Sequence, residues 1–250
     1  MATPAKTSQL VYQDALVNYL ISMARTVEGN VNRAIEALLK RDARLASDVF
    51  LTEPRVNEME IVIDEHAVRL LRSGNLTDPS VRFVVASLKI NNDLERIGDL
   101  AVNIGQRVLS LAQMGEVEYP PELSPMSDAV RAMVSKSLGG LIYQNVELAR
   151  EVLESDDVVD RYRDIIFERL LAAMTEDAAL AAPNLQFVLV SRYLERIADH
   201  TTNIAEDILF WLRGLEVSHG RGRLPEQQDG AATEAARGER FTEPGPADLP

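Results

Sequence analysis

The amino-acid sequence predicts an all-α protein, a tandem repeat of two three-helix bundles made from six long helices. The segment Leu94–Ile104, "LERIGDLAVNI", returns at Leu194–Ile204 as "LERIADHTTNI", with seven of eleven positions identical. Around both copies the apolar residues follow the alternating three- and four-residue spacing of a heptad, which is typical of long antiparallel helices packed at a shallow angle. Prolines are rare inside the helical pattern and gather between such segments. A duplicated helical unit is the architecture that these three observations favour.

The helix breakers divide the chain into six expected helices, at residues 7–41, 43–73, 78–114, 125–145, 146–175 and 182–215. Ser73-Gly74-Asn75 has the composition of a helix stop after the second segment. Asp78-Pro79 has that of a cap followed by a first-turn proline at the start of the third. The third and sixth segments carry the heptad seams, which are Leu94, Ile97, Ala101, Ile104, Val108 and Leu111, and Leu194, Ile197, Thr201, Ile204, Ile208 and Trp211.

The acidic, proline-rich stretch "GEVEYPPELSP" separates the six helices into three and three. We therefore expect one repeat over residues 1–114, a linker over 115–125 and a second repeat over 126–217. Residues 218–250 are poor in apolar side chains and cannot bury enough surface to offset the entropy of ordering, so they are predicted to form a disordered tail.

Composition excludes several classes of function. The formal charge of 26 − 39 = −13 argues against nucleic-acid binding and favours cations or basic partner surfaces. The absence of cysteine excludes disulfides, thiolate metal ligands and cysteine nucleophiles. The first residues lack a secretion signal, and no apolar run reaches the length of a bilayer span, so a cytoplasmic protein is expected.

Carboxylates recur with the repeat. Within the duplicated motif two acids and an asparagine follow each other at i, i+4 and i+8, which places them on one stripe, roughly opposite the apolar seam. The second and fifth helices each contain another i, i+4 pair of acids. The four pairs are Glu60 and Asp64, Glu95 and Asp99, Asp160 and Asp164, and Glu195 and Asp199. A single pair of this kind is more often a solvated face, but each of the four acids in the first half has an acid 100 residues later in the second half.

Neighbouring residues on the second and fifth helices fit slightly better at an offset of 103, and we expect the same face from both offsets because three residues make nearly one turn. Four carboxylates facing each other across a groove repel unless cations lie among them, which favours two metal sites. Oxygen ligands suit hard cations such as Mg²⁺, Ca²⁺, Mn²⁺ or ferric iron. His200 is expected to be a free surface histidine, and no Glu-x-x-His pair of the kind found in di-iron bundles occurs within the six predicted helices.

The two motifs, the segment "VNEMEIVIDE" and the duplicated layout resemble the PhoU family of bacterial phosphate-uptake regulators over residues 10–217. In that family Glu/Asp-x-x-x-Asp motifs lie on the second and third helices of each repeat, where some members hold multinuclear iron or zinc clusters. The ligands that the resemblance implies here are Glu60, Asp64, Glu95, Asp99, Asp160, Asp164, Glu195 and Asp199.

The resemblance also implies a function. It indicates a non-enzymatic negative regulator of phosphate uptake and phosphate-starvation signalling, linking the ATP-binding subunit of a phosphate ABC transporter to a phosphate-sensing histidine kinase. A homodimer that reaches the membrane only through these partners is expected. Two alternatives stay open at this point: a metal-dependent phosphoester hydrolase that activates water with paired metal ions, and a metal-free helical scaffold.

Overall fold

Helices make up nearly all of the chain that the structure, a computed structural model, describes: residues 4–74, 76–115 and 117–214, with side chains from residue 13 onward. The elements are α1 (Pro4–Lys40), α2 (Ala43–Phe50), α3 (Glu53–Arg72), α4 (Asp78–Ala112), α5 (Leu123–Tyr143), α6 (Val146–Leu153), α7 (Asp156–Glu176), the short 3-10 helix η1 (Ala178–Leu180) and α8 (Ala181–Arg213). No strand occurs in these residues, and the all-α prediction is confirmed. The tail predicted at 218–250 lies outside the described residues.

The order of elements repeats in the two halves. Each half has a first long helix, then a helix of eight residues, then a helix of about twenty residues and a final helix of more than thirty. The predicted six-helix plan is confirmed, except that the second and fifth segments are each broken once. The first break follows Phe50, where Thr52 Oγ1 donates to Asn30 Oδ1 on α1 over 2.6 Å and Pro54 occupies the first turn of α3. The second falls at Glu154 and Ser155.

The same turn joins the first two helices of each half. Arg41 and Gln144 adopt left-handed backbone conformations, with φ of 57° and 51°. The next residue in each case caps a helix: Asp42 accepts from the backbone N–H groups of two residues of α2, and Asn145 does so for α6. These caps are 145 − 42 = 103 residues apart, so this part of the repeat has an offset of 103.

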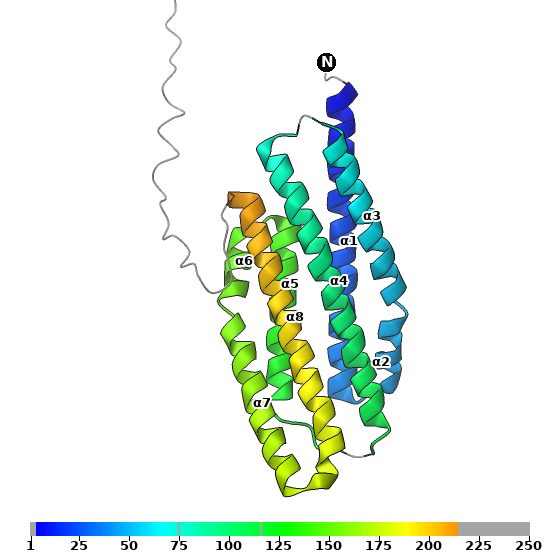
Figure 1. Cartoon of the computed structure of the whole chain (residues 1–250), viewed down its shortest axis with the longest axis vertical. Coiled ribbons are helices and arrows are strands. Elements are labelled where there is room, and N and C mark those ends of the chain that lie inside the picture. The colour runs from blue at the N-terminus through cyan, green and yellow to red at the C-terminus, as the bar shows by residue number, and fades with distance from the viewer. Residues whose placement is uncertain (1–3, 75, 116, 215–250) are drawn as a thin grey trace, which may run out of the picture. The chain divides into compact units, whose positions relative to one another are not determined.

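The core of the bundle lies around α4 and α8, which share the most extensive contact between any two elements. Figure 1 shows the two helices side by side, with α3 on the far side of α4 and α7 on the far side of α8. The central seam residues are fully buried as predicted; they are Leu94, Ile97, Ala101, Ile104, Leu194, Ile197, Thr201 and Ile204. None of the helices in the described part of the chain combines the length and apolar character that a transmembrane span requires.

A polar network also joins α4 to α8. Asp93, which is 7% exposed, accepts hydrogen bonds at Oδ1 from His200 Nδ1 over 2.7 Å and from Asn203 Nδ2 over 3.2 Å. Further along, Lys89 Nζ donates to Asp207 Oδ1 over 3.0 Å. The prediction of a free surface histidine at position 200 is therefore wrong. The pattern of one helix cannot indicate that the neighbour of His200 is an acid more than one hundred residues earlier in the chain.

Asp207 gives a pH-dependent prediction. Burial raises the pKa of this carboxyl, Lys89 opposes the shift and Asp93 adds to it. Because the folded-state pKa lies above the unfolded one, the charged carboxylate disfavours folding above that pKa, and this penalty disappears as the pH falls through it. We expect Asp207→Asn, which keeps an acceptor for Lys89, to raise the free energy of unfolding at pH 8 and to lose this advantage near pH 4. Urea unfolding at both pH values measures this, and a variant less stable than wild type at pH 8 would contradict it.

Candidate metal-binding residues

The first carboxylate set, Glu60, Asp64, Glu95 and Asp99, lies where α3 packs beside α4. Asn91, a buried residue of α4, fixes the register of the two helices: its Nδ2 donates to Asp64 Oδ1 over 3.0 Å and to the backbone carbonyl of Glu60 over 3.1 Å. The structure brings Glu60 within electrostatic reach of Glu95, whereas Asp64 meets the amide of Asn91 rather than an acid of α4.

Glu95 lies in an environment that disfavours its charged form. Its side chain is 15% exposed, and its Oε2 is buried without a hydrogen bond, with Arg96 Nε at 3.3 Å. Burial and the charge of Asp99 raise the pKa of Glu95, Arg96 lowers it, and Glu60 raises it further. A buried carboxylate oxygen that faces two other acids is a position where a bound cation would be favourable.

The second carboxylate set, Asp160, Asp164, Glu195 and Asp199, is organised differently because an arginine of α7 lies among its members. Arg163 Nη1 donates to Glu195 Oε1 over 2.5 Å and lies 3.4 Å from Asp160 Oδ1, while Nη2 donates to Asp164 Oδ1 over 2.8 Å. Burial lowers the pKa of Arg163, but the hydrogen bonds with Asp164 and Glu195 outweigh it and raise the pKa. The guanidinium is therefore a permanent positive charge within the set.

The two sets differ because the repeat has two offsets. Leu94 and Leu194 are 100 residues apart, but the buried residues of α3 recur on α7 after 103, as in 166 − 63; these are Val56, Ile63 and Ala67, and Val159, Ile166 and Leu170. Glu60 thus corresponds to Arg163 and Asp64 to Phe167. The expectation that both offsets give the same face is wrong, because three residues turn a helix by about 300° and leave the side chain about 60° short of the same direction.

The chemistry of the first set favours a bound cation, whereas that of the second set opposes one. As the side chains stand, no three His, Asp or Glu residues in the described ranges are close enough together to hold an ion. The first set fits a cation because its buried oxygen on Glu95 lacks a hydrogen bond. The second set does not fit one, because the guanidinium of Arg163 already contacts three of its four carboxylates. Metal binding by the eight predicted residues stays a prediction.

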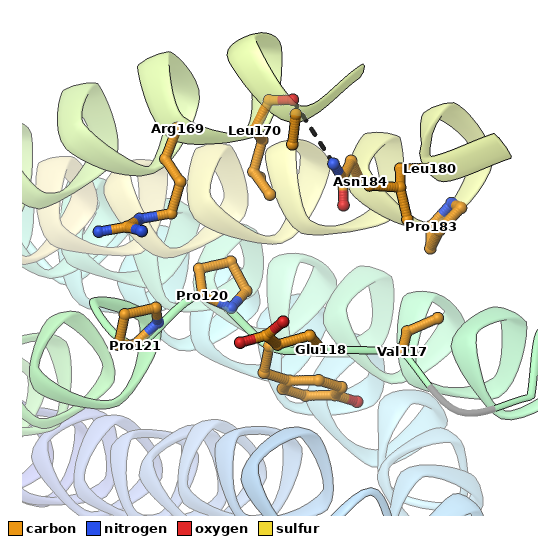
Figure 2. A pocket seen from close by; sticks show the side chains of 11 residues that line it. Val117, Glu118, Pro120, Pro121, Arg169, Leu170, Leu180, Pro183 and Asn184 are labelled. Atoms are coloured by element: carbon orange, nitrogen blue, oxygen red, sulfur yellow. Dashed lines mark hydrogen bonds between the residues drawn. The ribbon is translucent and has the colours of Figure 1, made fainter. Parts of the chain in front are cut away.

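A cavity of about 300 Å³ that sequence reasoning missed lies between residues 117–121 and the α7–α8 hairpin. Figure 2 shows Glu118, Pro120 and Pro121 on one side, with Arg169 and Asn184 facing them from the helices. The cavity has a structural cause. Leu123, at the start of α5, corresponds to Leu20 within α1 (123 − 20 = 103), so the turns of α1 before Leu20 have no helical counterpart in the second half. An extended segment covers the hairpin there and leaves space.

Comparison with known proteins shows which family shares this architecture. The family model described as "PhoU domain" matches residues 20–108 and again 123–208. The "Phosphate-specific transport system accessory protein PhoU homolog" of Pseudomonas putida is 34% identical over 233 residues, covering 92% of this chain and 90% of that protein. The protein of the same name from Pseudomonas aeruginosa is 34% identical, covering 84% of this chain and 88% of the relative.

Solved structures agree with these relatives. The crystal structure of PhoU from Pseudomonas aeruginosa aligns with a TM-score of 0.80 at 32% identity, covering 82% of this chain and 99% of that one. The phosphate transport system regulatory protein PhoU from Streptococcus pneumoniae aligns with a TM-score of 0.75 at 22% identity, covering 84% and 98%, and at that identity it supports the fold alone.

Proposed function

The chain belongs to the PhoU family, and from this membership we propose that it is an accessory protein of a phosphate-specific transport system. The observation that carries the proposal is the continuous match to a relative of that name along nine-tenths of both chains. Since the family model matches twice and the chain covers 90% of that relative, the role proposed for this chain is that of the whole relative.

The finer role is negative regulation of phosphate uptake and of phosphate-starvation signalling. In this proposal the chain acts by binding rather than by catalysis, as a homodimer on the cytoplasmic side of the membrane. It links the ATP-binding subunit of the phosphate ABC transporter to a phosphate-sensing histidine kinase, and it reaches the membrane only through them. The acidic surface, with a formal charge of −13, supports association with basic partner surfaces.

A divalent or trivalent cation held by the first carboxylate set is part of the proposal. The residues that would hold it are Glu60 and Asp64 from α3 and Glu95 and Asp99 from α4. The cation would supply positive charge that joins the two helices through their carboxylates. Iron or zinc follows from the family resemblance, while Mg²⁺, Mn²⁺ and Ca²⁺ suit the oxygen ligands equally.

Metal binding at this set gives a testable prediction. Mn²⁺ at about 100 times its dissociation constant should raise the free energy of unfolding of the chelator-treated protein by about 2.7 kcal/mol. Glu95→Gln should lose most of this increase, because the buried oxygen then carries no charge. The matched control is Glu58→Gln, at an exposed position of α3 that projects about 200° away from Glu60 and is not a member of the set. Equal stabilisation of wild type and Glu95→Gln by Mn²⁺ would remove the first set as the binding site.

Deletion of the gene tests the function itself. Because the chain is proposed to restrain the response, phosphatase expression under phosphate-rich conditions should rise in the deletion strain, and phosphate uptake should lose its restraint. A copy of the wild-type gene should restore both. Unchanged phosphatase expression and unchanged uptake after deletion would refute the proposed role.

A further inference from the structure

The second carboxylate set contains a positively charged side chain, Arg163, whereas the α3 acids of the first set have no such neighbour on their own helix, which the structure describes throughout. We propose that Arg163 is the resident cation of the second set, where its guanidinium takes the place of a metal ion, so that the second half of the chain does not bind divalent cations. This inference rests on the proposed function only in taking the first set as the half that does bind them.

The contacts of Arg163 are those of a bridging cation. From α7 the side chain reaches across to α8, where Nη1 meets Glu195, and the same group contacts Asp160 and Asp164 on its own helix. The arginine side chain is 23% exposed and that of Glu195 is 12% exposed, so the pair is largely shielded from water. Hydrogen bonds between ionised partners in such a setting are short and strong.

The first set has no comparable bridge. Its nearby arginine, Arg96, belongs to α4 and contacts Glu95 and Asp99 of that same helix, at 3.3 and 3.7 Å. The Arg96 side chain is 51% exposed, and so the ion pairs are open to solvent. The link between α3 and α4 comes instead from the neutral amide of Asn91. The negative charge of the first set is therefore only partly compensated by protein groups.

The offset between the two halves also indicates, independently of these contacts, that the second set does not bind a metal ion. At the offset of 103, Arg163 stands in the place of Glu60, and Phe167, 48% exposed, stands in the place of Asp64. The second set has thus lost both oxygen ligands that α3 provides to the first set and has gained a positive charge. A metal ion could enter only by displacing the guanidinium from Glu195 and Asp164, against the repulsion of like charges.

The test is to reverse the charge at position 163 in the full chain and to count bound Mn²⁺ by equilibrium dialysis with elemental analysis. Arg163→Glu, which restores the residue type found at Glu60, should bind about one further Mn²⁺ per chain compared with wild type. Adding Glu195→Gln should remove that gain. The matched control is Arg161→Glu, which makes the same change of charge at an exposed position of α7 that projects in another direction; it should gain none.

A second variant covers the case in which Arg163→Glu fails to fold. Arg163→Gln keeps the size and hydrogen-bonding capacity but removes the charge, and Mn²⁺ should raise its melting temperature more than it raises that of wild type. No gain of Mn²⁺ by Arg163→Glu, or an equal temperature shift for Arg163→Gln and wild type, would overturn the inference. These comparisons stand even if the wild-type protein binds no Mn²⁺ and the deletion strain has no phosphate phenotype, so the two proposals fail separately.

Discussion

Replacing Phe187 by alanine is expected to lower the free energy of unfolding by about 3–5 kcal/mol. Phe187 is a fully buried side chain of α8, and its ring meets that of Tyr119 in an edge-on contact with centroids 4.6 Å apart. The residue holds together α8 and the segment that precedes α5, where no helical turn corresponding to the start of α1 is present. Because that segment is not held by helical hydrogen bonds, its side-chain contacts decide whether it stays against the hairpin.

Urea unfolding followed by circular dichroism measures this loss. Leu185→Ala is the matched control, since Leu185 lies on the same helix and is 51% exposed; its substitution should change stability by less than about 0.5 kcal/mol. If the two variants lose similar amounts of stability, the contact of Phe187 with Tyr119 is not part of the core and the account of the second half is wrong.

Asp93→Ala is expected to cost about 2–4 kcal/mol, because two half-buried donors on α8 lose the acceptor that they share. Asp93 accepts from both His200 and Asn203 and so joins the halves of the bundle through a polar contact. Part of the loss is offset, since removal of Asp93 also relieves its repulsion of Asp207.

The conservative variant separates the hydrogen bonds from other effects. Asp93→Asn keeps an acceptor oxygen at the same place and should lose clearly less stability than the alanine variant. Asn92→Ala, at an exposed position one residue away on α4, should be nearly neutral. Equal losses in the alanine and asparagine variants would show that the hydrogen bonds to α8 contribute little.

Much of the fold follows from local sequence pattern. The spacing of Leu94, Ile97 and Ile104 determines which face of α4 is buried whatever lies against it, and the same holds for α8. The duplication of "LERI" with its acids indicates the internal repeat directly. Thr52 and Pro54 explain why the second predicted helix is broken, since a hydroxyl bond to α1 and a missing N–H group favour a new helix start there.

The candidate site is less accessible to sequence reasoning, because it depends on register between helices. The pairing of Glu60 with Asp160 at an offset of 100 matched residue types, but the buried residues pair Glu60 with Arg163. The hydrogen-bonding caps Asp42 and Asn145 are 103 residues apart. Applying this same offset to the carboxylates would have paired Glu60 with Arg163. The partners of His200 had no such signal, since no pattern within α8 indicates that α4 is its neighbour.

The central claim, that this chain is a regulatory accessory of a phosphate transport system, is tested most directly by isolating it from its own cells under phosphate-rich conditions and identifying what accompanies it. Affinity purification of a chromosomally tagged protein, with mass spectrometry of the eluate, should recover the ATP-binding subunit of a phosphate transporter together with a sensor histidine kinase, both enriched over an untagged strain. Recovery of neither protein, with the tagged chain present in full amount, would contradict the claim.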